Sequence, residues 1–332
     1  VLRAIIEVFQ MLYPKGKILL AAPTGRASRR MAESTGRNDA KTLHSLLGLL
    51  GDSGPIQKDK QKEPLDADLI IVDESSMIDM WLARQFFSRV RMGTRVILVG
   101  DVDQLQSVGA GDVFRELIDS GLIPVTVLNE IFRQKKGSLI AYNAKRINEA
   151  NIDLQYGEDF QFVKCQTQEE AADLICRIFY EQVALHGIEK VQILSPFRSE
   201  GPASVEQLNA AIRELVNPAR DEFADLKVGS HYFRVGDKVM QTKNNAKASN
   251  GDIGYIRKMG RNAKNEMDVT IEFSGDRIAE YGMEEMSHME LAYATTVHKA
   301  MGSEFDIVIM PILRSHYIML NRNIVYTAIT RA

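Results

Sequence analysis

Cysteine, tryptophan and long apolar runs are all scarce in this sequence. Its 332 residues include two cysteines, Cys165 and Cys176, and one tryptophan. Without further cysteines or clustered histidines, this pair predicts neither a disulfide framework nor a zinc site, and a reducing cytoplasm is the expected setting. No apolar run reaches the roughly 18 residues that a membrane span needs, so no membrane partner is expected. A formal net charge of -3 excludes a strongly basic coat. Any nucleic acid must therefore be held in a local groove rather than by a global field.

Length and composition indicate a globular chain of two domains. Hydrophobic residues make up 45% and charged residues 26% of the sequence, as is typical of globular proteins. A chain of this length exceeds one ordinary domain. The polar stretch 151–159 lacks periodicity, so we place the boundary there and expect one domain over 1–150 and a second over 151–332.

The sharpest pattern is a pair of strand ends. Apolar runs at 69–72 and 95–99 predict strands buried on both faces of a parallel sheet. Asp73 and Glu74 follow the first run, and a loop that carries Gln104 follows the second. Open α/β sheets place their chemistry at this carboxyl edge. Carboxylates there are suited to holding Mg²⁺ and to orienting a water for attack on a phosphate, and a neighbouring amide can contact that phosphate.

A second candidate site follows the predicted strand 17–22. Pro23, Thr24, Gly25 and Arg26 form a tight turn that opens a helix. Backbone N–H groups and the helix dipole make such a helix start a binding site for anions. The turn is not a P-loop, because the GxxxxGK[ST] spacing is absent.

The remaining pattern predicts alternating helices and strands and then a small barrel. Segment 49–65 loses periodicity and is expected to be an exposed loop or hairpin. Strand 160–163, helix 168–186 and strand 191–197 predict a crossover within a second parallel sheet. After residue 237, short alternating strands separated by glycine turns predict a small β-barrel. Further predicted helices cover 1–13, 112–120 and 138–150, and a further predicted strand covers 124–128.

Eight segments resemble motifs of the superfamily 1 helicases, in the version carried by the RecD-like branch. VDESSM at 72–77 and GDVDQLQSVGAG at 100–111 resemble the second and third motifs. The others, in chain order, are APTGRA at 22–27, TLHSLLG at 42–48, LNEIFRQ at 128–134, SPFR at 195–198, LAYATTVHKAMGSEF at 291–305 and VYTAITRA at 325–332. The resemblance spans nearly the whole chain, and Met301 departs from it by standing where the family usually has Gln.

The resemblance implies an α/β fold of two RecA-like, P-loop NTPase-type domains with parallel sheets. It implies a small hairpin insert over about 49–65, acting as the pin that separates strands, and an SH3-like β-barrel insert over about 240–289. The implied activity is ATP-dependent unwinding of duplex DNA in repair and recombination, with translocation 5′ to 3′ on single-stranded DNA. ATP and Mg²⁺ would be the cofactors, and a duplex junction would be bound as well. The resemblance also allows partner subunits of a helicase–nuclease complex.

The resemblance assigns roles to individual residues. Asp73 would hold Mg²⁺ and Glu74 would position the attacking water, while Gln104 would sense the γ-phosphate. Arg133 and Arg331 would stabilise that phosphate, with Arg331 as the arginine finger. Glu304 and Gly302 are the nucleotide-binding candidates beside them. The DNA-binding candidates are Pro23, Thr24, Gly25, Arg26, His44, Ser195, Arg198, Thr296, His298 and Lys299.

No segment matches the phosphate-cradling loop that precedes the first helix in the family. We therefore expect the chain to be a piece of a longer protein that by itself binds nucleotide weakly and does not unwind DNA. Two alternatives stay open: the helicase part of a conjugative relaxase, and a non-catalytic DNA-binding scaffold. Retention of the acid pair, Gln104 and both arginines argues against the scaffold.

Overall fold

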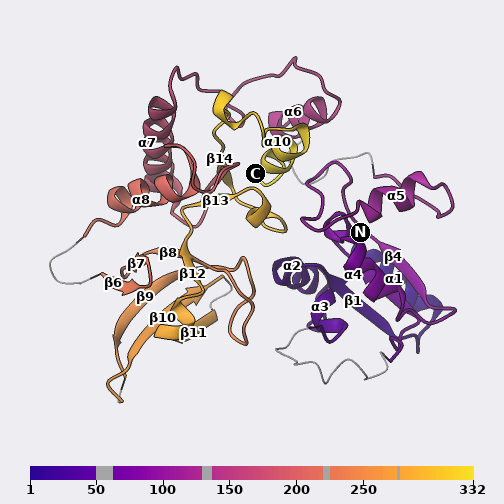
Figure 1. Cartoon of the computed structure of the whole chain (residues 1–332). Helices are drawn as coiled ribbons and strands as arrows, with labels where there is room; N and C mark the ends of the chain where they lie inside the picture. The colour runs from indigo at the N-terminus through magenta and orange to yellow at the C-terminus, as the bar shows by residue number, and fades with distance from the viewer. Residues whose placement is uncertain (50–62, 129–136, 220–224, 263, 275–276) are drawn as a thin grey trace. The chain divides into compact units, whose positions relative to one another are not determined.

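The chain divides into two units, Val1–Asn129 and Glu130–Ala332, in a computed structural model (Figure 1). The structure describes residues 1–332 except 50–62, 129–136, 220–224, 263 and 275–276. Most of the expected hairpin insert at 49–65 therefore lies outside the described residues. The division expected at residue 150 stays a prediction. In the structure, α6 (Leu139–Asn148) belongs to the second unit, where it contacts α10 (Arg322–Ile329).

A four-stranded parallel sheet forms the centre of the first unit, in the order β2-β1-β3-β4. Its strands are β1 (Ile18–Ala22), β2 (Lys41–Thr42), β3 (Leu69–Val72) and β4 (Arg95–Leu98). Its helices are α1 (Leu2–Leu12), α2 (Gly25–Thr35), α3 (Leu43–Leu46), the 3-10 turn η2 (Ser75–Met77), α4 (Met80–Phe87) and α5 (Val113–Asp119).

Strand β3 is buried on both faces, as its apolar sequence predicts. Side chains alternate across a strand. Leu69 and Ile71 accordingly join a core with α1 and α2, while Ile70 and Val72 join a second core with α3 and α4. Since both faces are covered, the polar residues that follow β3 emerge only at the carboxyl edge of the sheet.

The second unit contains a three-stranded parallel sheet in the order β13-β5-β14. Its strands are β5 (Val191–Ser195), β13 (Ala294–Thr296) and β14 (Ile307–Ile309). Helices α7 (Gln168–His186) and α8 (Val205–Val216) pack on it through a shared apolar core, and the short helices η3 (His298–Ala300) and η4 (Arg314–His316) lie in its loops.

Between α8 and β13 the chain forms an antiparallel barrel-like domain around its own apolar core (Figure 1). Five strands pair in the order β11-β10-β9-β8-β12, and β6 pairs with β7. The elements are β6 (Leu226–Val228), β7 (His231–Phe233), β8 (Lys238–Gln241), β9 (Ile253–Arg261), β10 (Met267–Phe273), β11 (Arg277–Gly282), α9 (Met283–Met286) and β12 (Met289–Leu291).

A buried carboxylate, Asp237, ties this barrel to the parallel sheet of the same unit. Asp237 accepts hydrogen bonds from Arg213 Nε at 3.1 Å, from Asn217 Nδ2 at 2.8 Å and from the Tyr293 hydroxyl at 3.0 Å. The backbone N–H of Arg234 donates to the same carboxylate at 2.8 Å. Because Asp237 is fully buried, its charge must be compensated by these groups.

Two predicted strands are wrong. Residues 124–128 and 160–163 have no strand conformation, and Val127 and Phe162 are exposed. Parallel neighbours of β5 come instead from β13 and β14, about a hundred residues later. Apolar, β-branched composition favours a strand only where a partner strand is available. Among the described residues, no helix is long and apolar enough to cross a membrane.

Candidate functional site

Three strand ends meet at the carboxyl edge of the first unit. Residue Ala21 of β1 pairs with Val72 of β3, which pairs with Leu98 of β4. The backbone N–H of Asp73 extends the pairing by donating to the Ala21 carbonyl at 2.9 Å. Because the strands are parallel and in register, the turns that follow them leave the sheet together. The structure thus brings together the Thr24 turn, the acid pair and the loop of Gln104.

The acid pair is held in an unusual backbone geometry. Glu74 has φ 51° and ψ 41°, a left-handed conformation that is uncommon for residues other than glycine. Its N–H donates to Asp73 Oδ1 at 2.9 Å, and the next N–H, of Ser75, donates to the Val99 carbonyl at 2.8 Å. Both carboxylates are half-buried. Such uncommon backbone geometry clusters at functional sites, which supports the catalytic reading of this pair.

The loop after β4 lies against the turn that follows Glu74. A Cβ at Gly100 would lie 3.0 Å from the Ser75 nitrogen, which is tighter than ordinary van der Waals contact, so this approach favours glycine. Within the loop, Gln104 Nε2 donates to Asp101 Oδ2 at 3.3 Å. This bond holds the amide beside Asp101, the residue that follows Gly100.

The far end of this loop is anchored on the start of α4. The Met80 N–H donates to the Ala110 carbonyl at 2.9 Å. A Cβ at Gly109 would lie 2.0 Å from Asp79 Oδ2. Asp79 also caps α4 by accepting from the Leu82 N–H at 2.7 Å. The glycines of GDVDQLQSVGAG thus allow the loop to close on the element that follows the acid pair.

The Thr24 turn forms the start of an eleven-residue helix, α2. Thr24 Oγ1 caps the helix by accepting from the Ala27 N–H at 3.2 Å. Burial, and secondarily the charge of Arg29, lowers the pKa of Arg26 to about 10. A guanidinium in such surroundings is stabilised by an anion, and this suits a phosphate at the helix start.

His44 lies beside this turn. Thr42 of β2 pairs with Ala22 of β1, so α3, which begins at Leu43, leaves the sheet next to Pro23. The His44 ring is half-buried and lies 6.3 Å from the Trp81 ring, measured between centroids. All five DNA-binding candidates of the first half therefore lie on neighbouring elements of one edge.

In the second unit, the end of β5 and the end of β13 are also adjacent. Thr296 pairs with Ser195, so the predicted DNA contacts after both strands leave the same edge. Ser195 is fully buried and its hydroxyl donates to the Ala203 carbonyl at 2.8 Å. A direct contact from this hydroxyl to DNA would require that bond to break. Thr296 Oγ1 accepts from the Lys299 N–H at 3.3 Å, and burial lowers the pKa of His298.

One carboxylate joins two of these cationic candidates, and sequence reasoning missed it. Glu290 accepts from Arg198 Nη2 at 2.8 Å and from Lys299 Nζ at 2.7 Å. Burial alone raises the pKa of Glu290, but Lys299 and Arg198 together hold it below its ordinary value. The signal available in the sequence was its position directly before LAYATTVHKA. Arg198 also pairs with Glu206 at 3.3 Å.

The nucleotide-binding candidates of the second unit lie together. Arg331 is buried, and its Nη1 donates to the Ser303 carbonyl at 3.3 Å. The Phe305 N–H donates to the Arg331 carbonyl at 2.8 Å. The exposed Glu304 lies between these two bonded residues, and Gly302, with φ 74°, directly precedes Ser303. Arg133, the other predicted phosphate contact, lies outside the described residues.

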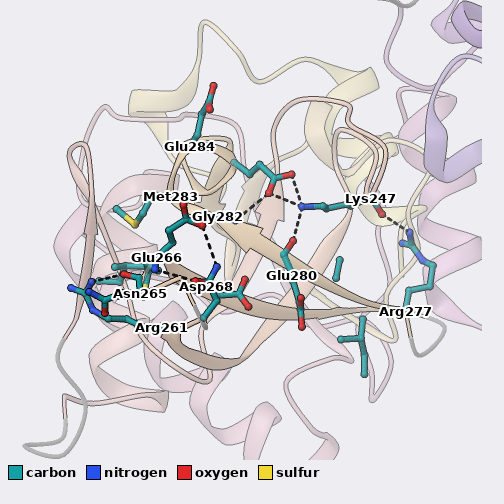
Figure 2. A pocket seen from close by; sticks show the side chains of 16 residues that line it. Lys247, Arg261, Asn265, Glu266, Asp268, Arg277, Glu280, Gly282, Met283 and Glu284 are labelled. Carbon is teal, nitrogen blue, oxygen red and sulfur yellow. Dashed lines mark hydrogen bonds and ion pairs between the residues drawn. The ribbon is translucent and has the colours of Figure 1, made fainter.

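An open groove of about 1550 Å³ lies on the barrel, and none of these candidates lines it (Figure 2). Its basic residues are Lys247, Arg261 and Arg277. Lys247 is engaged with Glu285 at 2.6 Å and with the Glu280 carbonyl at 2.6 Å. The carboxylates that line the groove are Glu266, Asp268, Glu280, Glu284 and Glu285. This balance of charge disfavours nucleic-acid phosphates, so we do not place the DNA there.

The chemistry of the acid pair fits Mg²⁺. No group of three or more His, Cys, Asp or Glu side chains suited to a metal occurs in the described part of the chain. Mg²⁺ is commonly held by one or two carboxylates together with substrate phosphates and waters. Asp73, with Glu74 next to it, has the oxygen ligands that this arrangement needs.

Comparison with known proteins defines the class of this chain. Residues 1–168 match the AAA domain family, residues 208–273 match the SH3 domain of ATP-dependent RecD-like DNA helicases, and residues 291–332 match the UvrD-like helicase C-terminal domain. The AAA domain match covers the parallel sheet whose carboxyl edge carries the acid pair. The chain belongs to the RecD-like superfamily 1 helicases.

Individual relatives agree with this assignment. The ATP-dependent RecD2 DNA helicase of Deinococcus radiodurans is 35% identical over 328 residues, which are 94% of this chain and 41% of that protein. RecBCD enzyme subunit RecD of Mycolicibacterium smegmatis is 28% identical over 352 residues, covering 96% of this chain and 61% of the relative. The chain thus spans only part of the length of either relative.

Solved structures confirm the fold. A Pif1 helicase from Bacteroides in complex with ADP-AlF3 and ssDNA matches with a TM-score of 0.61 and 21% identity, covering all of this chain and 82% of that one. Pif1 helicase from Candida albicans matches with a TM-score of 0.59 and 19% identity, covering 100% and 85%. The predicted pair of RecA-like domains with an SH3-like insert in the second is confirmed.

Proposed function

We propose that this chain is the motor core of an ATP-dependent DNA helicase that translocates on single-stranded DNA, 5′ to 3′. The observation that carries the proposal is the convergence of the Thr24 turn, the Asp73–Glu74 pair and the Gln104 loop at one sheet edge. Each part alone has ordinary structural explanations, but together they combine an acid pair and an amide suited to phosphate cleavage with a helix start suited to the phosphates of DNA.

In this proposal each side chain has a distinct task in ATP hydrolysis. Bound Mg²⁺ would neutralise charge on the phosphates, held by Asp73. Glu74 accepts a proton from the attacking water, and Gln104 contacts the terminal phosphate. Arg133 and Arg331 then stabilise the charge that develops on the transferring group, since a guanidinium is planar and permanently charged.

The DNA would be held at two edges, one in each unit. In the first unit the candidates are Pro23, Thr24, Gly25, Arg26 and His44. In the second they are Ser195, Arg198, Thr296, His298 and Lys299. Alternate tightening of the two sets during the hydrolysis cycle would move the strand. Gly302 and Glu304 would contact the nucleotide. The relatives named as RecBCD subunits support other subunits as partners.

The test is DNA-stimulated ATP hydrolysis and separation of a 5′-tailed duplex by the gene product that contains this sequence. Glu74→Gln removes the base and should lower the hydrolysis rate by at least about 100-fold while single-strand binding is retained. Glu116→Gln, an exposed position on α5, is the matched control and should leave the rate unchanged. Equal rates for both variants and the unmodified protein would exclude the assigned role of Glu74. For the 332-residue chain alone we expect weak nucleotide binding and no unwinding, because it lacks the GxxxxGK[ST] loop, and robust ATP turnover by this chain would contradict that expectation.

A further inference from the structure

Trp81, the single tryptophan of the chain, is 53% exposed. It is the second residue of α4, whose other face inserts Leu82, Ala83 and Phe86 into the core of the first unit. The packing of that face fixes the orientation of the helix, so the indole is directed outward by the fold. A large aromatic side chain left this exposed at a defined position is a candidate contact surface.

The surroundings of Trp81 match those of a nucleic-acid site. Its ring lies 6.3 Å from the His44 ring, with an interplanar angle of 31°. Met80, the preceding residue, is 50% exposed and enlarges the apolar surface. Leu43, next to His44, belongs to the same core as Leu82, and this shared packing holds the starts of α3 and α4 together.

The sheet register brings this surface next to the candidate phosphate site. Thr42 pairs with Ala22, so His44 leaves the sheet beside the turn that opens α2. Single-strand binding requires aromatic stacking for the bases and favourable electrostatics for the backbone. The aromatic rings and the neighbouring start of α2, which suits a phosphate, meet both requirements.

We propose that Trp81, flanked by His44, is a stacking platform for a base of single-stranded DNA whose phosphates lie at the start of α2. This inference rests on the proposed function and names a contact that the helicase motifs do not include. Stacking on an indole does not depend on base identity, because every base has a π-face. The platform therefore grips the strand without selecting its sequence.

The single tryptophan makes the test direct, because the tryptophan emission of the 332-residue chain reports on this position alone. A short oligothymidylate should quench the emission of Trp81. Trp81→Ala should weaken binding about 5- to 100-fold, and Trp81→Phe should retain most of the affinity. Phe87→Ala, at an exposed aromatic of the same helix that is 42% exposed, is the matched control and should bind as the unmodified chain does.

Two further readouts separate stacking from a structural role. Trp81→Ala should leave the slope of log affinity against log salt unchanged, because stacking releases no counterions. An oligomer with abasic sites should bind the unmodified chain more weakly than oligothymidylate does, and this difference should vanish in Trp81→Ala. Binding without quenching, or unchanged affinity in Trp81→Ala, overturns the inference and leaves the proposed function standing. Absence of single-strand binding in every variant contradicts the proposed function itself.

Discussion

Replacement of Asp237 by alanine tests whether the buried carboxylate holds the barrel onto the parallel sheet of the second unit. The substitution removes the partner of Arg213, whose Nε lies 3.0 Å from Asp237 Oδ2, and the acceptor for Asn217 and the Tyr293 hydroxyl. Breaking a buried ion pair from one side costs about 3–5 kcal/mol. Since Arg213 keeps Asp225 at 3.5 Å, we expect the lower end, about 3 kcal/mol.

The assay is urea unfolding followed by far-ultraviolet circular dichroism. With a denaturant slope of about 2 kcal/mol per molar urea, a loss of about 3 kcal/mol lowers the transition midpoint by about 1.5 M. Asp306→Asn is the control, because its pair with Lys190 at 3.3 Å is exposed and should be worth about 1 kcal/mol or less. Equal midpoints for Asp237→Ala and Asp306→Asn would refute the idea that this network stabilises the unit.

Two other substitutions test local features of the candidate site. Gly109→Ala places a Cβ 2.0 Å from Asp79 Oδ2 and should destabilise the first unit by about 1–3 kcal/mol in Trp81-monitored unfolding. Gly260→Ala, where a Cβ meets nothing within 4 Å, should be neutral, and equal effects would contradict the tight approach. Glu290→Gln removes the negative charge between Arg198 and Lys299 and should steepen the salt dependence of single-strand binding. Glu206→Gln, which removes the other partner of Arg198, should have a smaller effect. An unchanged slope of log affinity against log salt in Glu290→Gln argues against DNA at this edge. The pKa of Glu290 is lower in the folded state than in the unfolded state. The ionised Glu290 therefore stabilises the fold above about pH 4.3, and this contribution to the free energy of unfolding is lost as pH falls. Glu290→Gln should abolish this loss of stability at low pH when unfolding is measured as a function of pH.

Local sequence was sufficient for the first candidate site because its parts are close in the chain. Strand β3 is an uninterrupted apolar run, and burial on both faces requires that composition. Its polar continuation, Asp73 and Glu74, then emerges at the edge where parallel strands end. The glycines of the following loop were visible as a motif, although the close approaches at Gly100 and Gly109 that favour them were not.

The sequence alone was insufficient to predict contacts between segments that lie far apart in the chain. Segment 160–163 has the composition of a strand, yet β5 pairs with strands about a hundred residues later in the chain. Glu290 reads as an ordinary charge next to an apolar strand until the fold sets it between Arg198 and Lys299. Trp81 reads as one more apolar residue of α4 until packing turns it outward beside His44.

The sequence by itself determined the family, the order of the two α/β halves and the acidic strand end, because these depend on runs of neighbouring residues. Only the tertiary structure decided which strands pair in the second sheet, which cations share Glu290 and which aromatic ring faces outward. These depend on contacts between segments far apart in the chain. Such contacts are selected by packing and by the compensation of buried charge, and local composition records neither.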